Sequence, residues 1–142
     1  MEQRLSLITL GVADLARARR FYEDGLGWTR GNDEDDVAFY QLNGMILGLW
    51  SRAELAEDVR LPDTGAVFSG ITIAFNARTH EEVDDLLAQA ETAGGTILKP
   101  AEEQVWGGYS GYFADPDGHP WEVAFNPGWS IDDAGHVSLD AG

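Results

Sequence analysis

Two short stretches, Ile8-Thr9-Leu10 and Ile71-Thr72-Ile73, decide the fold of this chain. The first lies in an apolar run over residues 5–12, and the second lies in a similar run over residues 70–75. Runs of this length, rich in β-branched residues, predict strands. Because each strand leads into a predicted helix, the repeat indicates that one structural unit occurs twice.

The helices that follow the two strands have recognisable signals. Apolar residues recur at helical spacing over residues 15–24, after Asp14. The second helix begins at Thr79-His80-Glu81-Glu82, a pattern typical of a capping box, and runs to about residue 93. Asn43-Gly44 is a strong hairpin signal, and Asp115-Pro116-Asp117-Gly118 predicts a turn. The other predicted strands lie at about 28–31, 37–42, 45–50, 96–99, 109–114 and 120–126.

Each half of the chain therefore has the order β-α-β-β-β. A single unit of this kind is too small to close a core, but two units side by side can form one sheet. We expect an α+β fold: a curled, eight-stranded mixed sheet around a cavity, with the helices on its outer face. The expected segments are a first module (1–51), a connector (52–68), a second module (69–126) and an irregular tail (127–142).

Composition limits the possible functions. The 142 residues include 25 Asp and Glu but only 9 Lys and Arg, giving a formal net charge of −16. Nucleic acid and anionic membranes are therefore not expected as partners, because both attract positive charge. The lack of cysteine excludes disulfides, thiol catalysis and cysteine-bound metals. No apolar run approaches the roughly 18 residues of a membrane span, and no signal-peptide pattern is found, so we expect a cytoplasmic protein.

The last predicted strand, Pro120–Phe125, carries the most informative polar residue. Successive side chains of a strand point to opposite faces, so Trp121, Val123 and Phe125 share the face that suits the core. Glu122 points the other way. It is either an ordinary solvent-facing carboxylate or a group that lines the cavity as a general base or metal ligand.

The stretch from Trp106 to Glu122, Trp-Gly-Gly-Tyr-Ser-Gly-Tyr-Phe-Ala-Asp-Pro-Asp-Gly-His-Pro-Trp-Glu, resembles the closing hairpin of the vicinal oxygen chelate superfamily. This superfamily includes glyoxalase, extradiol dioxygenases and bleomycin- and fosfomycin-resistance proteins. The opening residues 8–15 and the segment 20–28 resemble the first strand and helix of the same family. The resemblance covers about residues 5–126 and implies the fold more specifically than the activity.

The resemblance also implies four positions that bind a metal in the metal-dependent members. In this sequence they correspond to Leu7, a residue near Gly48, Gly70 and Glu122, so only Glu122 keeps a ligating group. A zinc or iron site needs at least three protein ligands. We therefore expect no metal site and no cofactor.

Replacement of the ligands leaves an apolar floor with aromatic residues around it, which is typical of a small-molecule site. Either Phe39 or Tyr40 must point inward from its strand. The expected lining residues are Leu7, Thr9, Phe39, Gly48, Trp50, Gly70, Thr72, Trp106, Ser110, Tyr112 and Glu122.

Two functions are compatible with such a site. The first is a metal-independent binding protein similar to the bleomycin-resistance type, which holds a small, aromatic or cationic molecule. The alternative is an enzyme of the superfamily, a lyase or isomerase for a small carbonyl compound that uses Glu122 as a general base or metal ligand. The resemblance further implies a homodimer.

Overall fold

The computed structural model describes residues 1–142 except 26, 65–67, 115–117 and 141–142. Most of the predicted turn at 115–118 lies outside the described residues. The strands are β1 (Leu7–Val12), β2 (Val37–Gln41), β3 (Ile46–Ser51), β4 (Ile71–Asn76), β5 (Thr96–Glu103), β6 (Tyr109–Ala114), β7 (Pro120–Phe125), β8 (Ser130–Ile131) and β9 (Val137–Ser138). The helices are α1 (Leu15–Arg20), continued by a π-helical turn (Phe21–Gly25), α2 (Arg52–Val59) and α3 (His80–Thr92).

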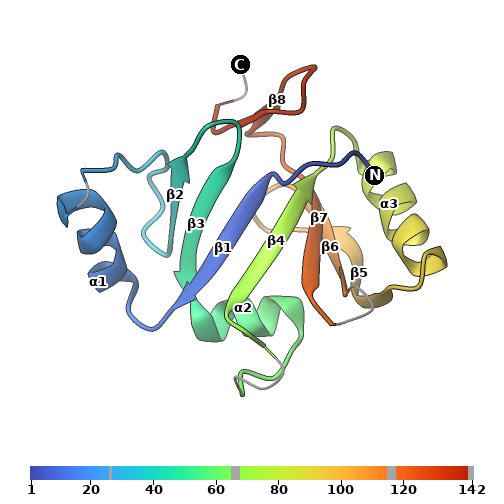
Figure 1. The fold of residues 1–142 in the computed structure, drawn as a ribbon, viewed down its shortest axis with the longest axis horizontal. Helices are drawn as coiled ribbons and strands as arrows, with labels where there is room; N and C mark the ends of the chain where they lie inside the picture. The colour runs from blue at the N-terminus through green and yellow to red at the C-terminus, as the bar shows by residue number, and fades with distance from the viewer. Residues whose placement is uncertain (26, 65–67, 115–117, 141–142) are drawn as a thin grey trace.

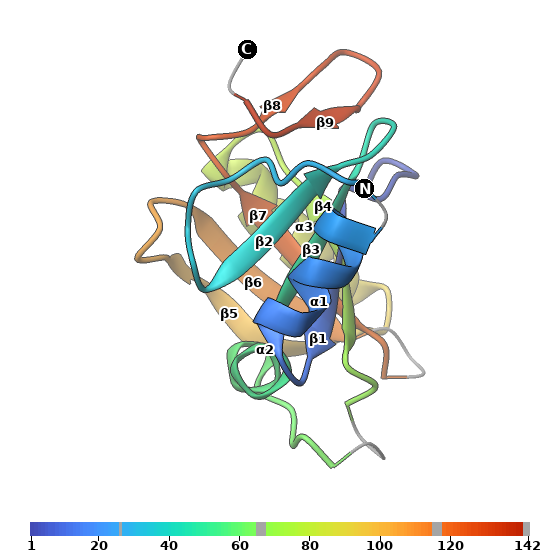
Figure 2. The same cartoon turned by 90° about the vertical axis from the view of Figure 1, so that its left-hand side faces the viewer.

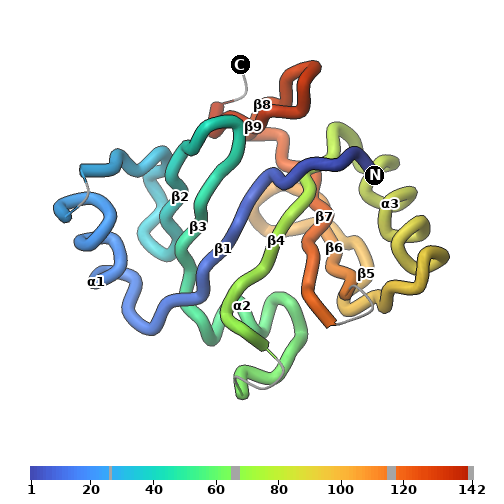
Figure 3. The backbone as a smooth tube through the Cα atoms, viewed as in Figure 1, coloured from blue at the N-terminus to red at the C-terminus, as the bar shows by residue number. Residues whose placement is uncertain are grey.

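Seven strands form one mixed, open sheet in the order β2-β3-β1-β4-β7-β6-β5 (Figure 1). Its two halves meet where β1 pairs antiparallel with β4, and the backbone trace shows these two strands side by side at the centre (Figure 3). Thr9 lies directly opposite Thr72 in this pair. The two matching stretches of sequence are thus related by a local two-fold axis through these threonines, which makes Gly11 correspond to Ala74. The predicted α+β class and the mixed sheet are confirmed.

The outer face of the sheet carries α1 and α3, as predicted. In Figure 1, α1 lies beyond β2 and β3 on one side and α3 lies against β6 and β7 on the other. Helix α3 buries Val83, Leu86 and Leu87 against Phe113 and Val123. The side chain of Thr79 accepts a hydrogen bond from the backbone N–H of Glu82 at 3.1 Å, so the predicted helix start is confirmed.

The inner face is covered at both ends by elements that the sequence reading did not foresee. Helix α2, within the expected connector, buries Leu55 and Val59 against Trp50 and Tyr112. Trp50 belongs to β3 and Tyr112 to β6, on opposite halves of the sheet. One helix can pack with both because the sheet curls around it. At the other end, the tail forms the small hairpin β8–β9 above the sheet (Figure 2).

The predicted strand at 28–31 is wrong, so the main sheet has seven strands in the described part of the chain rather than eight. Residues 31 and 32 instead pair with the edge strand β2 through only a few hydrogen bonds. The backbone N–H of Gly31 donates to the carbonyl of Phe39 at 2.8 Å. The Asn32 side chain then accepts from the N–H of Phe39 and donates to the carbonyl of Val37. An amide side chain here replaces the backbone ladder.

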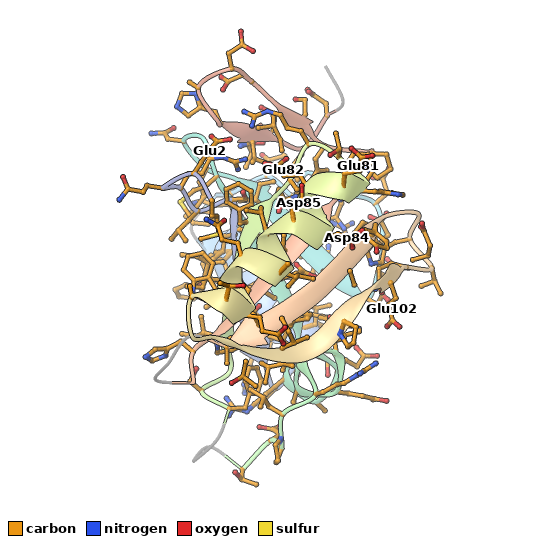
Figure 4. All side chains as sticks on the ribbon, turned by 90° about the vertical axis from the view of Figure 1, so that its right-hand side faces the viewer. Glu2, Glu81, Glu82, Asp84, Asp85 and Glu102 are labelled. Carbon is orange, nitrogen blue, oxygen red and sulfur yellow. The ribbon has the colours of Figure 1, made fainter. Side chains whose placement is uncertain are left out.

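Much of the negative charge lies on the outer surface. Figure 4 shows Glu81, Glu82, Asp84 and Asp85 around α3, away from the inner face of the sheet. This distribution agrees with a role of the net charge in solubility. Among the described residues, no helix is long and apolar enough to cross a lipid bilayer.

Candidate functional site

A row of directly paired residues crosses the inner face of the sheet. Leu7 of β1 pairs with Ala74 of β4, and Ala74 pairs with Glu122 of β7. Glu122 in turn pairs with Tyr112 of β6. Directly paired residues place their side chains on the same face. The register therefore brings Glu122 inside the curl of the sheet, opposite the face that α3 covers, as the alternation of the last strand predicts.

Glu122 is the central polar group of this row, and its side chain is partly exposed to solvent. Burial raises the pKa of its carboxyl from 4.5 to about 7, and the negative charge of Asp58 adds to this effect. A hydrogen bond with Tyr112 and the positive charge of Lys99 act in the opposite direction on the pKa. A carboxyl group with a pKa near neutrality can take up or release a proton under physiological conditions.

Tyr112 connects Glu122 to a second carboxyl group. Its hydroxyl donates a hydrogen bond to Oδ2 of Asp58 at 2.8 Å, and the residue pairs in register with Glu122. The side chain is 2% exposed. Burial, followed by the negative charges of Glu122 and Asp58, raises the pKa of the phenol well above 10.0. Tyr112 therefore stays neutral and acts as a hydrogen-bonding group.

Lys99 completes the network from the edge strand β5. Its Nζ lies 2.9 Å from Oδ1 of Asp58 and 3.6 Å from Oε1 of Glu102. The lysine is 7% exposed and pairs in register with Tyr112. The β5–β6 register shifts on both sides of Lys99, and this irregularity turns an otherwise solvent-seeking side chain toward the interior. A nearly buried ammonium requires a carboxylate partner, which Asp58 supplies.

Helix α2 brings Asp58 over the sheet. Its first turn is capped by the Ser51 hydroxyl, which accepts from the N–H of Glu54 at 3.4 Å. It ends at Arg60, whose φ of 61° is left-handed and stops the helix. Leu55 and Val59 are both buried against the inner face, so this side of the helix faces the sheet. Asp58, which directly precedes Val59, thereby contacts the Tyr112 hydroxyl and the Lys99 ammonium.

Most of the predicted lining residues share the inner face. Phe39, rather than Tyr40, points inward: its ring meets Trp129 with centroids 5.1 Å apart, whereas Tyr40 packs with Tyr22 and Trp28 on the outer side. The members that strand register and packing place on this face are Leu7, Thr9, Phe39, Gly48, Trp50, Thr72, Ser110, Tyr112 and Glu122. Their role in binding a ligand stays a prediction.

The floor of the inner face is more tightly filled than the sequence suggested. A Cβ atom added to Gly48 would lie 3.2 Å from the ring of Phe39 and 3.3 Å from Oγ1 of Thr9. Thr9 and Thr72 are 7% and 3% exposed. The tail hairpin packs Trp129, Ile131, Val137 and Leu139 over the end of the face that holds Leu7. Glu122 is thus the polar group of the row that remains open to solvent.

Two predicted lining residues lie elsewhere. Gly70 precedes β4, where its carbonyl accepts from the N–H of Gly11 at 2.7 Å and the Arg52 guanidinium fills the space beside it. Trp106 is 48% exposed in the turn between β5 and β6, with its ring over Gly108. Neither belongs to the paired row of strand residues that holds Glu122.

The structure also revises one correspondence between the modules. Gly11 pairs with Trp50 in the first half, as Ala74 pairs with Glu122 in the second. Trp50, rather than Gly48, therefore stands where the local two-fold axis would place a counterpart of Glu122. The position predicted from the sequence thus lies two residues before the one that the strand register gives.

Asp58 and Lys99 are functional candidates that the sequence reading missed. Asp58 lies in a segment expected to be a connector, and its burial depends on where α2 docks. Lys99 had one available signal: it is the only lysine among the 142 residues, and it lies in a predicted strand. Neither feature by itself predicts a place near Glu122, because α2, β5 and β7 lie far apart in the sequence.

The donors around Glu122 do not fit a transition-metal site. In the part of the chain that the structure describes, no three His, Cys, Asp or Glu side chains converge in a way that could hold a metal ion. Leu7 and Ala74 share the row with Glu122, and Asp58 is already paired with Lys99.

Two surface hollows lie away from Glu122, one beside Trp121 and the N-terminal residues and one beside Trp28 and Tyr40.

Comparison with proteins of known sequence gives two kinds of relative. The glutathione transferase FosA of Serratia marcescens is 30% identical over 123 residues, covering 87% of this chain and 81% of FosA. The metallothiol transferase FosB of Staphylococcus saprophyticus is 27% identical over 123 residues, covering 87% of this chain and 77% of FosB. These names describe the relatives.

Among solved structures, a glyoxalase-related enzyme from Fulvimarina pelagi is 42% identical, with a TM-score of 0.51 and coverage of 99% of this chain and 100% of that one. The Mn(II)-bound glyoxalase of Novosphingobium aromaticivorans shares the fold, with 23% identity, a TM-score of 0.57 and coverage of 85% of this chain and 38% of that one. The profile of the Glyoxalase/Bleomycin resistance protein/Dioxygenase superfamily matches residues 4–123. With this match over most of its length, the chain belongs to that superfamily.

Proposed function

We propose that this protein binds a small molecule at the inner face of its sheet, with Glu122 as the polar anchor and without a divalent metal ion. The observation that carries the proposal is the network of Glu122, Tyr112, Asp58 and Lys99, in which one carboxyl group stays partly open to solvent. Ala74 lies directly beside Glu122 in the sheet and Leu7 lies beyond Ala74, and neither side chain can bind a metal ion.

The surroundings of Glu122 favour a ligand that combines a flat apolar part with a cationic or hydrogen-bonding group. Two carboxyl groups face a single ammonium, so the site accepts positive charge. Trp50 and Phe39 are partly exposed on the same curved face and offer ring surfaces for stacking. Sequestration of a planar cation is one function that such a surface can perform.

A thermal-shift screen tests the binding proposal. Planar cationic compounds and uncharged analogues of the same ring size are compared on the wild-type protein and on Glu122→Gln. We expect stabilisation by the cations that Glu122→Gln largely removes. Glu103→Gln is the matched control, because Glu103 is an exposed glutamate outside the inner face. Equal stabilisation of both variants would contradict Glu122 as the anchor.

Metal retention tests the other half of the proposal. The protein is incubated with Zn²⁺, Ni²⁺, Mn²⁺ or Fe²⁺, dialysed against a weak chelator and examined by elemental analysis. We expect no stoichiometric metal. About one tightly held ion per chain, lost in Glu122→Gln, would instead favour a metal-dependent function and would contradict this half of the proposal.

A specific observation favours a second candidate, an enzyme that uses Glu122 as a general acid or base. The pKa of about 7 lets the carboxyl group exchange a proton with a small carbonyl substrate. Such a group alone supplies about 10²–10⁴-fold acceleration. If Glu122 is a general acid or base, Glu122→Gln abolishes turnover but retains substrate binding. If Glu122 is a binding anchor, the same substitution also abolishes binding.

We also propose that the protein forms a homodimer. The central strands expose Ile71 of β4, which is 44% exposed, and Leu5 just before β1, at the other end of the strand pair, is 37% exposed. Figure 1 shows no helix over this part of the sheet. Light scattering coupled to gel filtration tests the mass, and Ile71→Asp is expected to shift it toward the monomer. A monomeric mass for the wild type would contradict the proposal.

A further inference from the structure

Asn76, the last residue of β4, buries an amide side chain within the sheet. The residue is 3% exposed, and its Oδ1 has no hydrogen-bond partner in the part of the chain that the structure describes. A buried acceptor that stays unpaired costs free energy, because it has given up its bonds to water. Such an atom in a folded protein requires an explanation, and a ligand that pairs with it is one.

The backbone of Asn76 is firmly held on both sides. Its N–H donates to Oγ of Ser6 at 2.7 Å, and its carbonyl accepts from the Arg4 guanidinium at 2.9 Å. These bonds fix the position of the residue in the sheet. The terminal torsion of an asparagine side chain has a broad range, so Oδ1 can turn toward a donor while the backbone stays in place.

The Asn76 side chain lies on the inner face, near Glu122. Phe75 and Ala77, its neighbours in the chain, both belong to the hydrophobic cluster beneath α3, so Asn76 points to the opposite face. In the pairing of β4 with β7, Asn76 lies beside Ala124, two residues along the strand from Glu122. With the usual spacing of strands and of residues along them, the Cα atoms of Asn76 and Glu122 lie about 8 Å apart. One small head group can therefore meet both side chains.

We propose that Asn76 is a specificity-determining residue, whose side-chain oxygen accepts a hydrogen bond from an N–H group of the ligand bound at Glu122. The inference rests on the proposed function, in which Glu122 anchors the ligand. A planar cation with adjacent N–H groups, such as an amidinium or a guanidinium, donates one N–H to the carboxyl group of Glu122 and another to Oδ1 of Asn76. A cation whose nitrogens are fully alkylated leaves Oδ1 unpaired.

The pairing of an amide oxygen with a carboxyl group determines the class of ligand. Both groups accept hydrogen bonds, so they suit a ligand that carries donors and disfavour a carboxylate or a phosphate, which offers further acceptors. A site built to pair with a donor strongly rejects an analogue that lacks it, because a buried polar group is then left unpaired. The competing occupant is a buried water molecule, which would satisfy Oδ1 in the protein without ligand.

The test compares benzamidinium with its N,N,N′,N′-tetramethyl analogue, which keeps the ring and the charge but has no N–H group. Dissociation constants are measured by NMR titration for the wild type and for Asn76→Leu, whose side chain keeps the branching of asparagine without its polar atoms. We expect the wild type to prefer benzamidinium, and the variant to reduce that preference about tenfold or more. An unchanged preference, or no binding of benzamidinium to the wild type, would overturn the proposal.

Thermal unfolding without ligand separates a binding role from a structural one. Asn76→Leu removes the buried acceptor, so we expect its midpoint to lie between that of the wild type and about 3 °C above it. Ser6→Ala is the matched control, because the Ser6 hydroxyl is buried but bonded to the N–H of Asn76 and to Arg4. Its midpoint should fall by about 3 °C.

A second variant, Asn76→Ala, removes the amide without adding bulk and keeps the test valid if leucine does not fit. It should reduce the preference for benzamidinium as Asn76→Leu does, and backbone NMR spectra verify the fold of each variant. If both Asn76 variants lose as much stability as Ser6→Ala, a buried water already satisfies the amide and the proposal is overturned.

The same probes distinguish failure of this inference from failure of the proposed function. If Glu122→Gln abolishes benzamidinium binding while Asn76→Leu leaves the preference unchanged, Glu122 is the anchor and Asn76 takes no part. If Asn76→Leu reduces the preference while Glu122→Gln leaves binding unchanged, the role of Asn76 is supported and the assignment of Glu122 as the anchor is wrong.

Discussion

The two halves of the sheet share a backbone plan but differ in chemistry. In the second half, Ala74, Glu122 and Tyr112 follow one another across β4, β7 and β6. The corresponding row of the first half runs from Gly11 to Trp50, and Trp50 pairs with Val37. A carboxyl and a phenol on one side thus correspond to an indole and an isopropyl group on the other.

The elements that cover the two halves also differ in polarity. The polar row of the second half faces Asp58 on α2 and Lys99 on β5. Over the first half, the tail packs apolar side chains against Phe39 and Leu7. The comparison teaches that the repeated unit supplies the frame, whereas the connector helix and the tail, which lie outside the repeat, supply much of the different cover of each half.

The largest expected effect concerns the ionisation of Glu122. Its pKa is about 7 in the folded protein and 4.5 ordinarily, so the folded state binds more protons between these values and stability falls as pH rises through that range. The full difference corresponds to about 3 kcal/mol. Because the side chain is partly exposed, we expect about 2 kcal/mol.

Urea denaturation of the wild type and of Glu122→Gln at pH 5 and pH 8 measures this effect. The variant should be about 2 kcal/mol more stable than the wild type at pH 8, and the difference should shrink toward pH 5. Glu103→Gln, on an exposed residue, serves as the control. A difference that is the same at both pH values would show that Glu122 does not carry the raised pKa.

A comparable or slightly smaller effect is expected from the apolar half. Trp129→Ala removes the ring that packs on Phe39 and opens the cover over Leu7. Since Trp129 is partly buried, we expect a loss of about 2 kcal/mol in the free energy of unfolding. Trp106→Ala is the matched control, because Trp106 is 48% exposed, and it should cost under about 0.5 kcal/mol. Equal losses would mean that the hairpin does not stabilise this half.

The smallest effect should come from single hydroxyl groups. Tyr112→Phe removes a buried hydroxyl that bonds Asp58, and we expect a cost of about 1 kcal/mol by chemical denaturation. Tyr109→Phe is the control on the outer face, where the hydroxyl donates to the exposed Asp84 at 2.7 Å. That variant should cost only a few tenths of a kcal/mol, about the size of a surface bond. A larger cost for Tyr109→Phe would reverse the expected contrast between the two faces.

Much of the fold could be predicted from local patterns. The strands at β1, β4, β6 and β7 and the helix α3 follow from alternation, apolar spacing and a capping box, all of which depend on residues close in sequence. The strand expected at 28–31 could not be excluded in this way. Its absence depends on Asn32, whose side chain bonds the edge of β2 in place of a backbone ladder.

The candidate site likewise has one part that local sequence patterns predict and another that depends on tertiary packing. The sequence by itself placed Glu122 and Tyr112 on one face, because side chains alternate along a strand and the turn between their strands is short. Asp58, Lys99 and Trp129 join the inner face only through the docking of α2, the irregular register of β5 and the folding back of the tail. These contacts depend on how distant elements pack, and no local pattern specifies them. Composition and alternation thus determined the sheet and its acid, and tertiary packing decided which charges surround that acid and what remains open to solvent.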